Sequence, residues 1–232
     1  MSSSDHINDH MFRTESAEDV AKCRGTEPVH FEWKVLSVAP KVLELGGDKF
    51  LSDFEIEHIK EIATPLLERS VTGAGGHENT ARTSSNAWVK RSMSDVLDWI
   101  FRRLADAVKV DEGHLWDTIG SESVQVVHYD VGQQYKAHHD WRTNRLQTRF
   151  ATFLIYLTDM ESPDAGGETE FPKARDENGN KLKVHPGGGR AAMFYDMLED
   201  GNVDDLTLHA ALPVKEGEKW LANVWIWDPN FS

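Results

Sequence analysis

The sequence predicts an α+β fold that is mainly β, with helices in its N-terminal half packed on one face of a β core. Two segments with apolar residues at helical spacing lie before residue 110. After Gly120 the chain changes to β-branched and aromatic runs that are bounded by Gly, Pro and Asp. Short runs of this kind are typical of antiparallel sandwiches and barrels.

The length of 232 residues suits one domain with a sizeable core. We expect this domain over residues 33–232. Residues 1–32 are polar and acidic with little apolar periodicity, and we expect them to form a flexible extension.

The N-terminal half of the domain is predicted to hold two strands and two helices. Strands are expected over residues 35–38 and 41–45, on either side of Pro40. Ser52 and Glu55 have the spacing of a capping box, which predicts the start of a helix that Pro65 bends or shortens. Ser94 is the expected N-cap of the second helix, whose apolar side carries Val96, Leu97, Ile100, Phe101, Leu104 and Val108.

Strands are predicted in the second half over residues 124–129, 150–157, 191–195 and 220–227. Two Gly-rich polar stretches are predicted to lie outside the regular structure. Residues 72–86 are expected to form a mobile loop, and residues 163–189 a surface excursion.

The composition excludes some classes of partner. The net charge of −14 argues against nonspecific binding of nucleic acid, which needs a basic face. No run of about 18 apolar residues is present, so we expect no membrane partner. The single cysteine, Cys23, forbids an internal disulfide, and the N-terminus lacks the pattern of a signal peptide. Both favour the cytoplasm, although a chain cleaved from a secretory leader would look the same. The oligomeric state is left open.

His138, Asp140 and His209 are the candidate metal ligands. Residues i and i+2 of a strand point to the same side, so His138 and Asp140 can face one point. If His209 joins them, two nitrogens and one oxygen leave half an octahedron open, as in non-heme Fe(II) oxygenases. The alternative is that both histidines are ordinary core residues. His139 alternates to the opposite face and is not expected to ligate, and His128 has no expected role.

Further motifs flank these three residues. Tyr129 precedes them, Lys219 follows them, and Gly-Gly-Glu-Thr-Glu-Phe-Pro lies between them at residues 166–172. Together, over residues 35–229, the chain resembles the prolyl 4-hydroxylase family of 2-oxoglutarate/Fe(II) dioxygenases. This resemblance implies a double-stranded β-helix, or jelly-roll, as the β core.

The resemblance also implies the roles of residues around the metal. His138, Asp140 and His209 would bind Fe(II), and 2-oxoglutarate and dioxygen would take the open positions. Lys219 would bind the distal carboxylate of 2-oxoglutarate and thus belong to the catalytic set. Other expected contacts to this cosubstrate are Tyr129, Tyr156, Thr169 and Trp225.

The implied substrate is a proline-containing peptide or protein. Arg82 and Ser84 would lie on a loop that folds over it, and Tyr135 and Arg149 would lie near its channel. The implied reaction hydroxylates peptidyl proline at C4 and yields succinate and carbon dioxide, with ascorbate as reductant. Trp227 stands where some relatives place a smaller or polar residue, which bears on peptide preference.

Three other functions stay open at this point. The enzyme could act on a free amino acid or on a different protein side chain. A non-catalytic binding module on the same scaffold would be expected to lose a ligand or the lysine, and this chain keeps all four. A metal hydrolase would not need Lys219.

Overall fold

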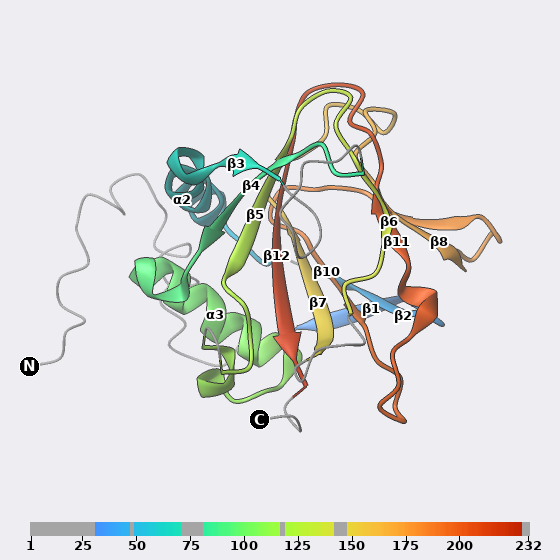
Figure 1. Ribbon diagram of the computed structural model, residues 1–232, viewed down its shortest axis with the longest axis horizontal. Helices are drawn as coiled ribbons and strands as arrows, with labels where there is room; N and C mark the ends of the chain where they lie inside the picture. Colours follow the sequence, from blue (N-terminus) through green and yellow to red (C-terminus); the bar gives the residue numbers. More distant parts are fainter. Residues whose placement is uncertain (1–30, 47–48, 71–80, 117–118, 142–147, 229–232) are drawn as a thin grey trace, which may run out of the picture.

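Two antiparallel sheets form the centre of this protein, as seen in a computed structural model (Figure 1). The structure describes residues 31–46, 49–70, 81–116, 119–141 and 148–228. In spatial order, the larger sheet contains β1 (Glu32–Val38), β2 (Lys41–Gly46), β10 (Ala191–Tyr195), β7 (Arg149–Tyr156), β12 (Lys219–Trp227), β5 (Val124–Tyr129), β4 (Ser85–Val89) and β3 (Glu68–Arg69). The smaller sheet contains β6 (Tyr135–His138), β11 (His209–Ala211), β8 (Thr169–Arg175) and β9 (Lys181–Val184).

Two α-helices follow the first hairpin, and their caps are those expected from the sequence. In α2 (Asp53–Ala63), the Glu55 amide donates to Ser52 Oγ, and the Ser52 amide donates to the Glu55 carboxylate. In α3 (Asp95–Val108), Ser94 Oγ accepts from the Leu97 amide. Short 3₁₀ helices cover Thr64–Leu66, Arg91–Met93, Glu112–Leu115 and Asp205–Thr207.

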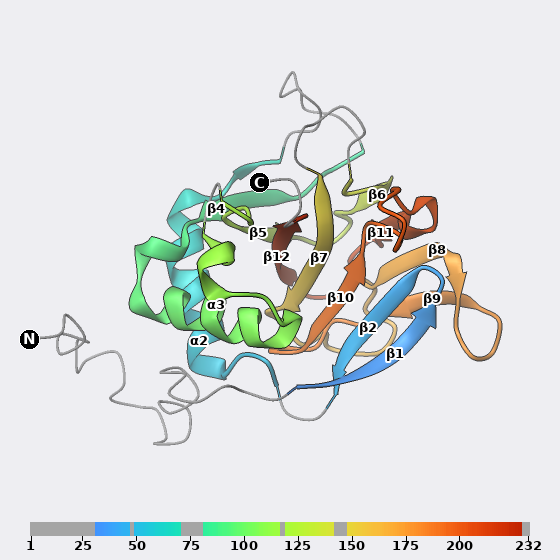
Figure 2. The ribbon, with the colours of Figure 1, turned by 90° about the horizontal axis from the view of Figure 1, so that it is seen from below.

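The helices cover one face of the larger sheet, and the smaller sheet lies toward its other face (Figure 2). The helix side of the core is formed by apolar residues of α2 and α3 against β5, β7 and β12. On the other side, Tyr156 of β7 packs with Phe171 of β8 and Leu182 of β9. The predicted mainly β class with a jelly-roll core is therefore confirmed.

The prediction that residues 163–189 form a surface excursion is wrong. This stretch contains β8 and β9, and it buries Phe171, Leu182 and Val184. The two strands are short, and their buried residues alternate with charged ones. Such a stretch has the composition of a loop until its period of two is noticed.

The predicted loop over residues 72–86 is also partly wrong. Ser85 and Asn86 begin strand β4, which pairs with β5, and the backbone at Arg82 bridges to Tyr135. Residues 71–80, including the glycine run, lie outside the described residues. Residues 1–30 of the extension expected over residues 1–32 do so too, while Phe31 packs against Phe50 and Glu32 begins β1. No helix in the described ranges is long and apolar enough to cross a membrane.

Candidate active site

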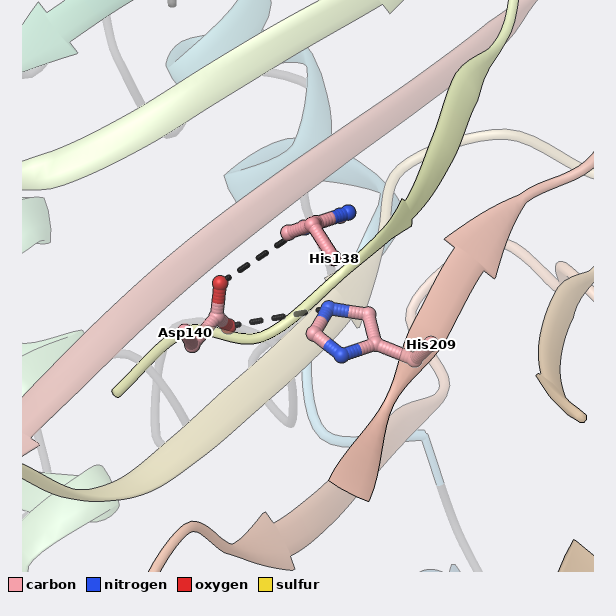
Figure 3. Close-up of side chains that lie close together, drawn as sticks. All are labelled: His138, Asp140 and His209. Atoms are coloured by element: carbon pink, nitrogen blue, oxygen red, sulfur yellow. Dashed lines mark ion pairs between the residues drawn. The ribbon is translucent and has the colours of Figure 1, made fainter. Parts of the chain in front are cut away.

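His138, Asp140 and His209 converge between the two sheets (Figure 3). His138 ends β6 and His209 begins β11, and they are directly opposite each other in the antiparallel pair. Asp140 Oδ1 lies 3.6 Å from His138 Nε2, and Asp140 Oδ2 lies 3.7 Å from His209 Nε2. One potential ligand atom from each of the three residues lies within 4.8 Å of the other two. The smaller sheet thus brings together three residues that could hold one ion.

The hydrogen bonds of both histidines leave their Nε2 atoms available. His138 Nδ1 lies 2.9 Å from the Lys136 carbonyl, and His209 Nδ1 lies 3.0 Å from the Thr207 carbonyl. Because a carbonyl can only accept, each Nδ1 carries a hydrogen, and Nε2 is the nitrogen that a neutral ring would offer to a metal. Burial, with help from His209, lowers the pKa of His138 to about 3. Neutral imidazoles facing a carboxylate are a donor set that fits Fe(II).

Asp140 is held as an anion by its surroundings. Burial opposes its ionisation, but His209, His138 and Arg149 together hold its pKa below the ordinary value. Its Oδ2 accepts hydrogen bonds of 2.9 Å from Thr152 Oγ1 and from Trp225 Nε1. Trp225, an expected contact of the cosubstrate, lines the cavity beside these residues and also donates to the candidate metal ligand.

Arg149 binds a partner that the sequence analysis did not identify. Its Nε and Nη2 donate to the two oxygens of Glu122 at 2.7 and 2.9 Å, and its guanidinium lies 3.6 Å from the centre of the Trp225 ring. Burial opposes the charge, yet the bonds to Glu122 and the charge of Asp140 raise the pKa of Arg149. Arg149 thus forms a cavity wall beside Asp140.

A cavity of about 240 Å³ opens beside the three residues. Its walls come from both sheets and combine aromatic rings, side-chain amides and one buried arginine. The lining residues outside the metal set include Arg82, Asn86, Trp88, Gln125, Tyr129, Tyr135, Arg149, Thr169, Asn223 and Trp225.

Lys219 lies at the start of β12, opposite Tyr129 of β5, and is completely buried. Its Nζ donates to the Gly167 carbonyl at 2.6 Å and lies 5.4 and 5.7 Å from the centres of the Tyr129 and Tyr156 rings. Burial lowers the pKa of Lys219 to about 7, against a smaller opposing effect of Glu168. The predicted cosubstrate lysine is therefore a buried amine whose nearest partners are a carbonyl and two rings, and it lies behind Tyr129 rather than in the cavity lining.

The other predicted cosubstrate contacts fall into two sets. Tyr129 and Thr169 line the cavity. Tyr156 is completely buried and donates to Thr169 Oγ1 at 3.0 Å, so it positions Thr169 from behind. Burial raises the pKa of both tyrosines, which stay neutral donors.

The predicted peptide contacts are also divided. Tyr135 lines the cavity and stacks on His138 with ring centres 3.6 Å apart. Arg82 lines the cavity too, and donates to Gln125 at 3.0 Å and to Ser84 at 3.2 Å. Ser84 is expected to contact the peptide from a loop that folds over it, but its side chain is completely buried. Its hydroxyl contacts Arg82 and Tyr129, and it therefore supports the wall from behind.

Two further histidines were set aside in the sequence analysis. His139 Nε2 lies 3.1 Å from the Asp205 carbonyl, and His139 is outside the group of potential ligands although it lines the cavity. His128 pairs with Glu218 at 2.6 Å on the outer side of β5. Thr152, Asp196 and Glu122 were missed, because their positions depend on strand pairing that no local motif announces.

The chain is similar to known proteins over most of its length. The family model of the 2OG-Fe(II) oxygenase superfamily matches residues 124–227. "Probable prolyl 4-hydroxylase 3" of Arabidopsis thaliana is 32% identical in an alignment of length 237, gaps included. The alignment covers 92% of this chain and 76% of that protein. "Prolyl 4-hydroxylase 5" of the same plant is 33% identical over 217 residues, covering 83% and 70%.

Solved structures agree with this similarity. The viral collagen prolyl hydroxylase of Paramecium bursaria Chlorella virus 1, in its 2OG complex, has a TM-score of 0.60 and 31% identity, and covers 78% of this chain and 93% of that chain. A Pseudomonas putida prolyl-4-hydroxylase, 16% identical with a TM-score of 0.54, covers 90% and 99% and shows the shared fold alone. Because it is about one third identical to the two plant proteins over most of their length, the chain belongs to the prolyl 4-hydroxylase family of 2-oxoglutarate/Fe(II) oxygenases.

Proposed function

We propose that this protein hydroxylates proline in a peptide or protein substrate at C4, using Fe(II), 2-oxoglutarate and dioxygen. One observation carries the proposal. A His-Asp-His group lines a cavity, and a buried lysine lies behind Tyr129 in its wall, in a chain whose relatives are named prolyl 4-hydroxylases. When bound, Fe(II) and 2-oxoglutarate supply the oxidising chemistry with dioxygen, and 2-oxoglutarate leaves as succinate and carbon dioxide.

The residues of the chain would bind and orient the reactants. His138, Asp140 and His209 would hold the iron through two neutral imidazoles and one carboxylate. Lys219 would pair with the distal carboxylate of 2-oxoglutarate, a charge-assisted contact that a neutral residue cannot replace. Tyr129 and Thr169 would add hydrogen bonds to the same cosubstrate, since both line the cavity.

The peptide would bind at the mouth of the cavity. Trp88 is 45% exposed there, near Trp225, and Tyr135 presents its ring beside His138. Rings of this kind suit a proline side chain and the extended polyproline-II form, which costs little ordering. Arg82 and the Gln125 amide that it holds would face the peptide backbone.

Two further properties are part of the proposal. Ascorbate would serve as the reductant that restores Fe(II) after unproductive turnover. A cytoplasmic location stays a prediction from the single cysteine and the N-terminal composition.

The test is mass spectrometry of proline-rich peptides incubated with the full chain, Fe(II), 2-oxoglutarate and ascorbate. We expect one added oxygen atom on proline, and decarboxylation of 2-oxoglutarate that depends on the peptide. A matched peptide with Ala in place of Pro is the control, and free proline should be a poor substrate. Oxygen on lysine or asparagine, or equal turnover of free proline, would overturn the peptidyl proline proposal.

A further inference from the structure

Asp196 is a second buried carboxyl group close to the candidate metal ligand Asp140. It follows β10 directly, and its side chain is completely buried. Its Oδ2 lies 2.9 Å from Thr152 Oγ1. Its Oδ1 has no hydrogen-bond partner among the described residues. A buried carboxyl with one bare oxygen is costly as an anion, so its presence beside the site needs an explanation.

The hydrogen bonds around Thr152 leave one proton to be assigned. Thr152 Oγ1 lies 2.9 Å from Asp196 Oδ2 and 2.9 Å from Asp140 Oδ2. A hydroxyl has one hydrogen, so it cannot donate to two carboxylates at once. A proton on Asp196 satisfies both contacts, because Asp196 then donates to Thr152 and Thr152 donates to Asp140. Burial and the charge of Asp140 both favour this state, since they raise the pKa of Asp196.

We propose that Asp196 is a positioning residue, which as a neutral acid turns the Thr152 hydroxyl toward Asp140 Oδ2. With Trp225 Nε1 on the same oxygen, this arrangement leaves Oδ1 for the metal. The inference rests on the proposed function in one respect only, that Asp140 is a metal ligand. The line from Asp196 through Thr152 to Asp140 fixes the carboxylate before the metal binds.

The strand pairing explains how this line of residues is built. Thr152 of β7 is directly opposite Trp225 of β12 on one side and Phe194 of β10 on the other. Asp196 follows two residues after Phe194, and its backbone amide donates to the Phe150 carbonyl at 2.8 Å. Three adjacent strands of the larger sheet therefore supply the groups behind Asp140.

The backbone of Asp196 is also linked to the second histidine. Its carbonyl accepts from the Asp204 amide at 2.9 Å, and the Asp204 carbonyl accepts from Thr207 Oγ1 at 2.7 Å. Thr207 in turn offers its carbonyl to His209 Nδ1. Replacing the Asp196 side chain leaves this backbone branch in place, so a side-chain variant tests the Asp140 branch alone.

The experiment measures Mn(II) binding to the full chain by electron paramagnetic resonance, without cosubstrate or peptide, alongside the melting temperature. Asp196→Asn keeps a neutral donor toward Thr152, and we expect a dissociation constant for Mn(II) within about twofold of that of the unmodified chain. Asp196→Leu and Thr152→Val each remove the donor, and each should weaken Mn(II) binding about tenfold. The double variant Asp196→Leu/Thr152→Val should bind Mn(II) like Thr152→Val, because both changes break one line.

Each other result has a defined meaning. If Asp196→Asn binds Mn(II) as weakly as Asp196→Leu, or if Thr152→Val and Asp196→Leu bind like the unmodified chain, the positioning role is overturned. If the expected Mn(II) pattern appears in a chain that hydroxylates no peptide, the positioning role stands and the proposed substrate falls. A change in melting temperature alone, with Asp196→Asn no better than Asp196→Leu, would assign Asp196 to packing.

Discussion

Two buried ionisable groups, Asp140 in the cavity wall and Lys219 behind Tyr129, have opposite surroundings. Asp140 receives two hydrogen bonds on Oδ2, has Arg149 at 3.7 Å, and faces two histidines. Lys219 has one backbone carbonyl and two aromatic rings, and no described carboxylate lies within 4.0 Å of its Nζ. The protein surrounds the carboxylate with hydrogen bonds and positive charge, whereas the amine has only the weaker effect of the Glu168 charge.

This difference shows that the fold alone stabilises the charge of Asp140, whereas full charge on Lys219 needs a bound ligand. An isolated buried charge costs several kcal/mol, and a neutral partner such as a carbonyl or a ring returns only part of that cost. The metal side is therefore arranged before any ligand binds. On the lysine side, burial lowers the pKa to about 7, so the amine is only partly charged near pH 7, and a dicarboxylate that entered the cavity would favour its charged form.

The largest expected effect is at the metal side. Replacing His138, Asp140 or His209 with Ala should reduce turnover by on the order of 10³-fold or more, because each would remove one of three metal ligands. Turnover of 2-oxoglutarate measures the loss. His185→Ala is the matched control, since His185 is exposed and lies outside the cavity lining. Equal losses at His185 would contradict the assignment of the ligands.

The second effect is at the lysine side. Lys219→Ala should raise KM for 2-oxoglutarate roughly 100-fold, because a buried charge pair would be lost. Affinity for Mn(II) should stay within about twofold, since Lys219 does not touch the metal residues. Lys183→Ala on β9 is the control for loss of a lysine, because its side chain is half exposed. An unchanged KM would show that another group binds the distal carboxylate.

Some residues of the metal side and of the lysine side could be predicted from the sequence, and others could not. Strand geometry predicted that His138 and Asp140 face one point, which the structure confirms, but β6 ends at His138 and Asp140 lies beyond the strand. Lys219 and His209 came from the resemblance. Thr152 and Asp196 could not be found in this way. Their role depends on pairing between β10, β7 and β12, and a threonine or aspartate beside a strand has many ordinary uses. Similarly, β8 and β9 were missed because a short half-buried strand with charged residues resembles a loop.

A smaller effect is expected from loss of one of the two hydrogen bonds that Asp140 Oδ2 accepts. Trp225→Phe keeps the ring over which Arg149 lies but removes the Nε1 donor to Asp140. We expect the dissociation constant for Mn(II) to rise about tenfold. Trp33→Phe loses a comparable Nε1 bond, to the Ala107 carbonyl, and should leave Mn(II) binding unchanged. A tenfold effect in both variants would indicate a general loss of stability rather than a local one.

The smallest effect concerns the pH dependence of 2-oxoglutarate binding. The pKa of Lys219 is lowered to about 7, so the fraction of charged amine falls as pH rises through 7. If the dicarboxylate binds the charged form, its dissociation constant should rise about threefold between pH 6.5 and 7.5. Titration calorimetry with Mn(II) bound measures this change. His138 stays neutral throughout, since its pKa is about 3.

Lys219→Arg provides the matched control for this last prediction, because a guanidinium keeps its charge across the whole range. Its affinity for 2-oxoglutarate should not change between pH 6.5 and 7.5, whatever its absolute value.

The lowered pKa of Lys219 also makes the stability of the ligand-free protein depend on pH. The unfolded chain binds more protons at Lys219 between pH 7 and its ordinary pKa of 10.5, so the ligand-free protein should gain stability as pH rises in that window. If either dependence on pH persists in Lys219→Arg, the titrating group is a residue other than Lys219.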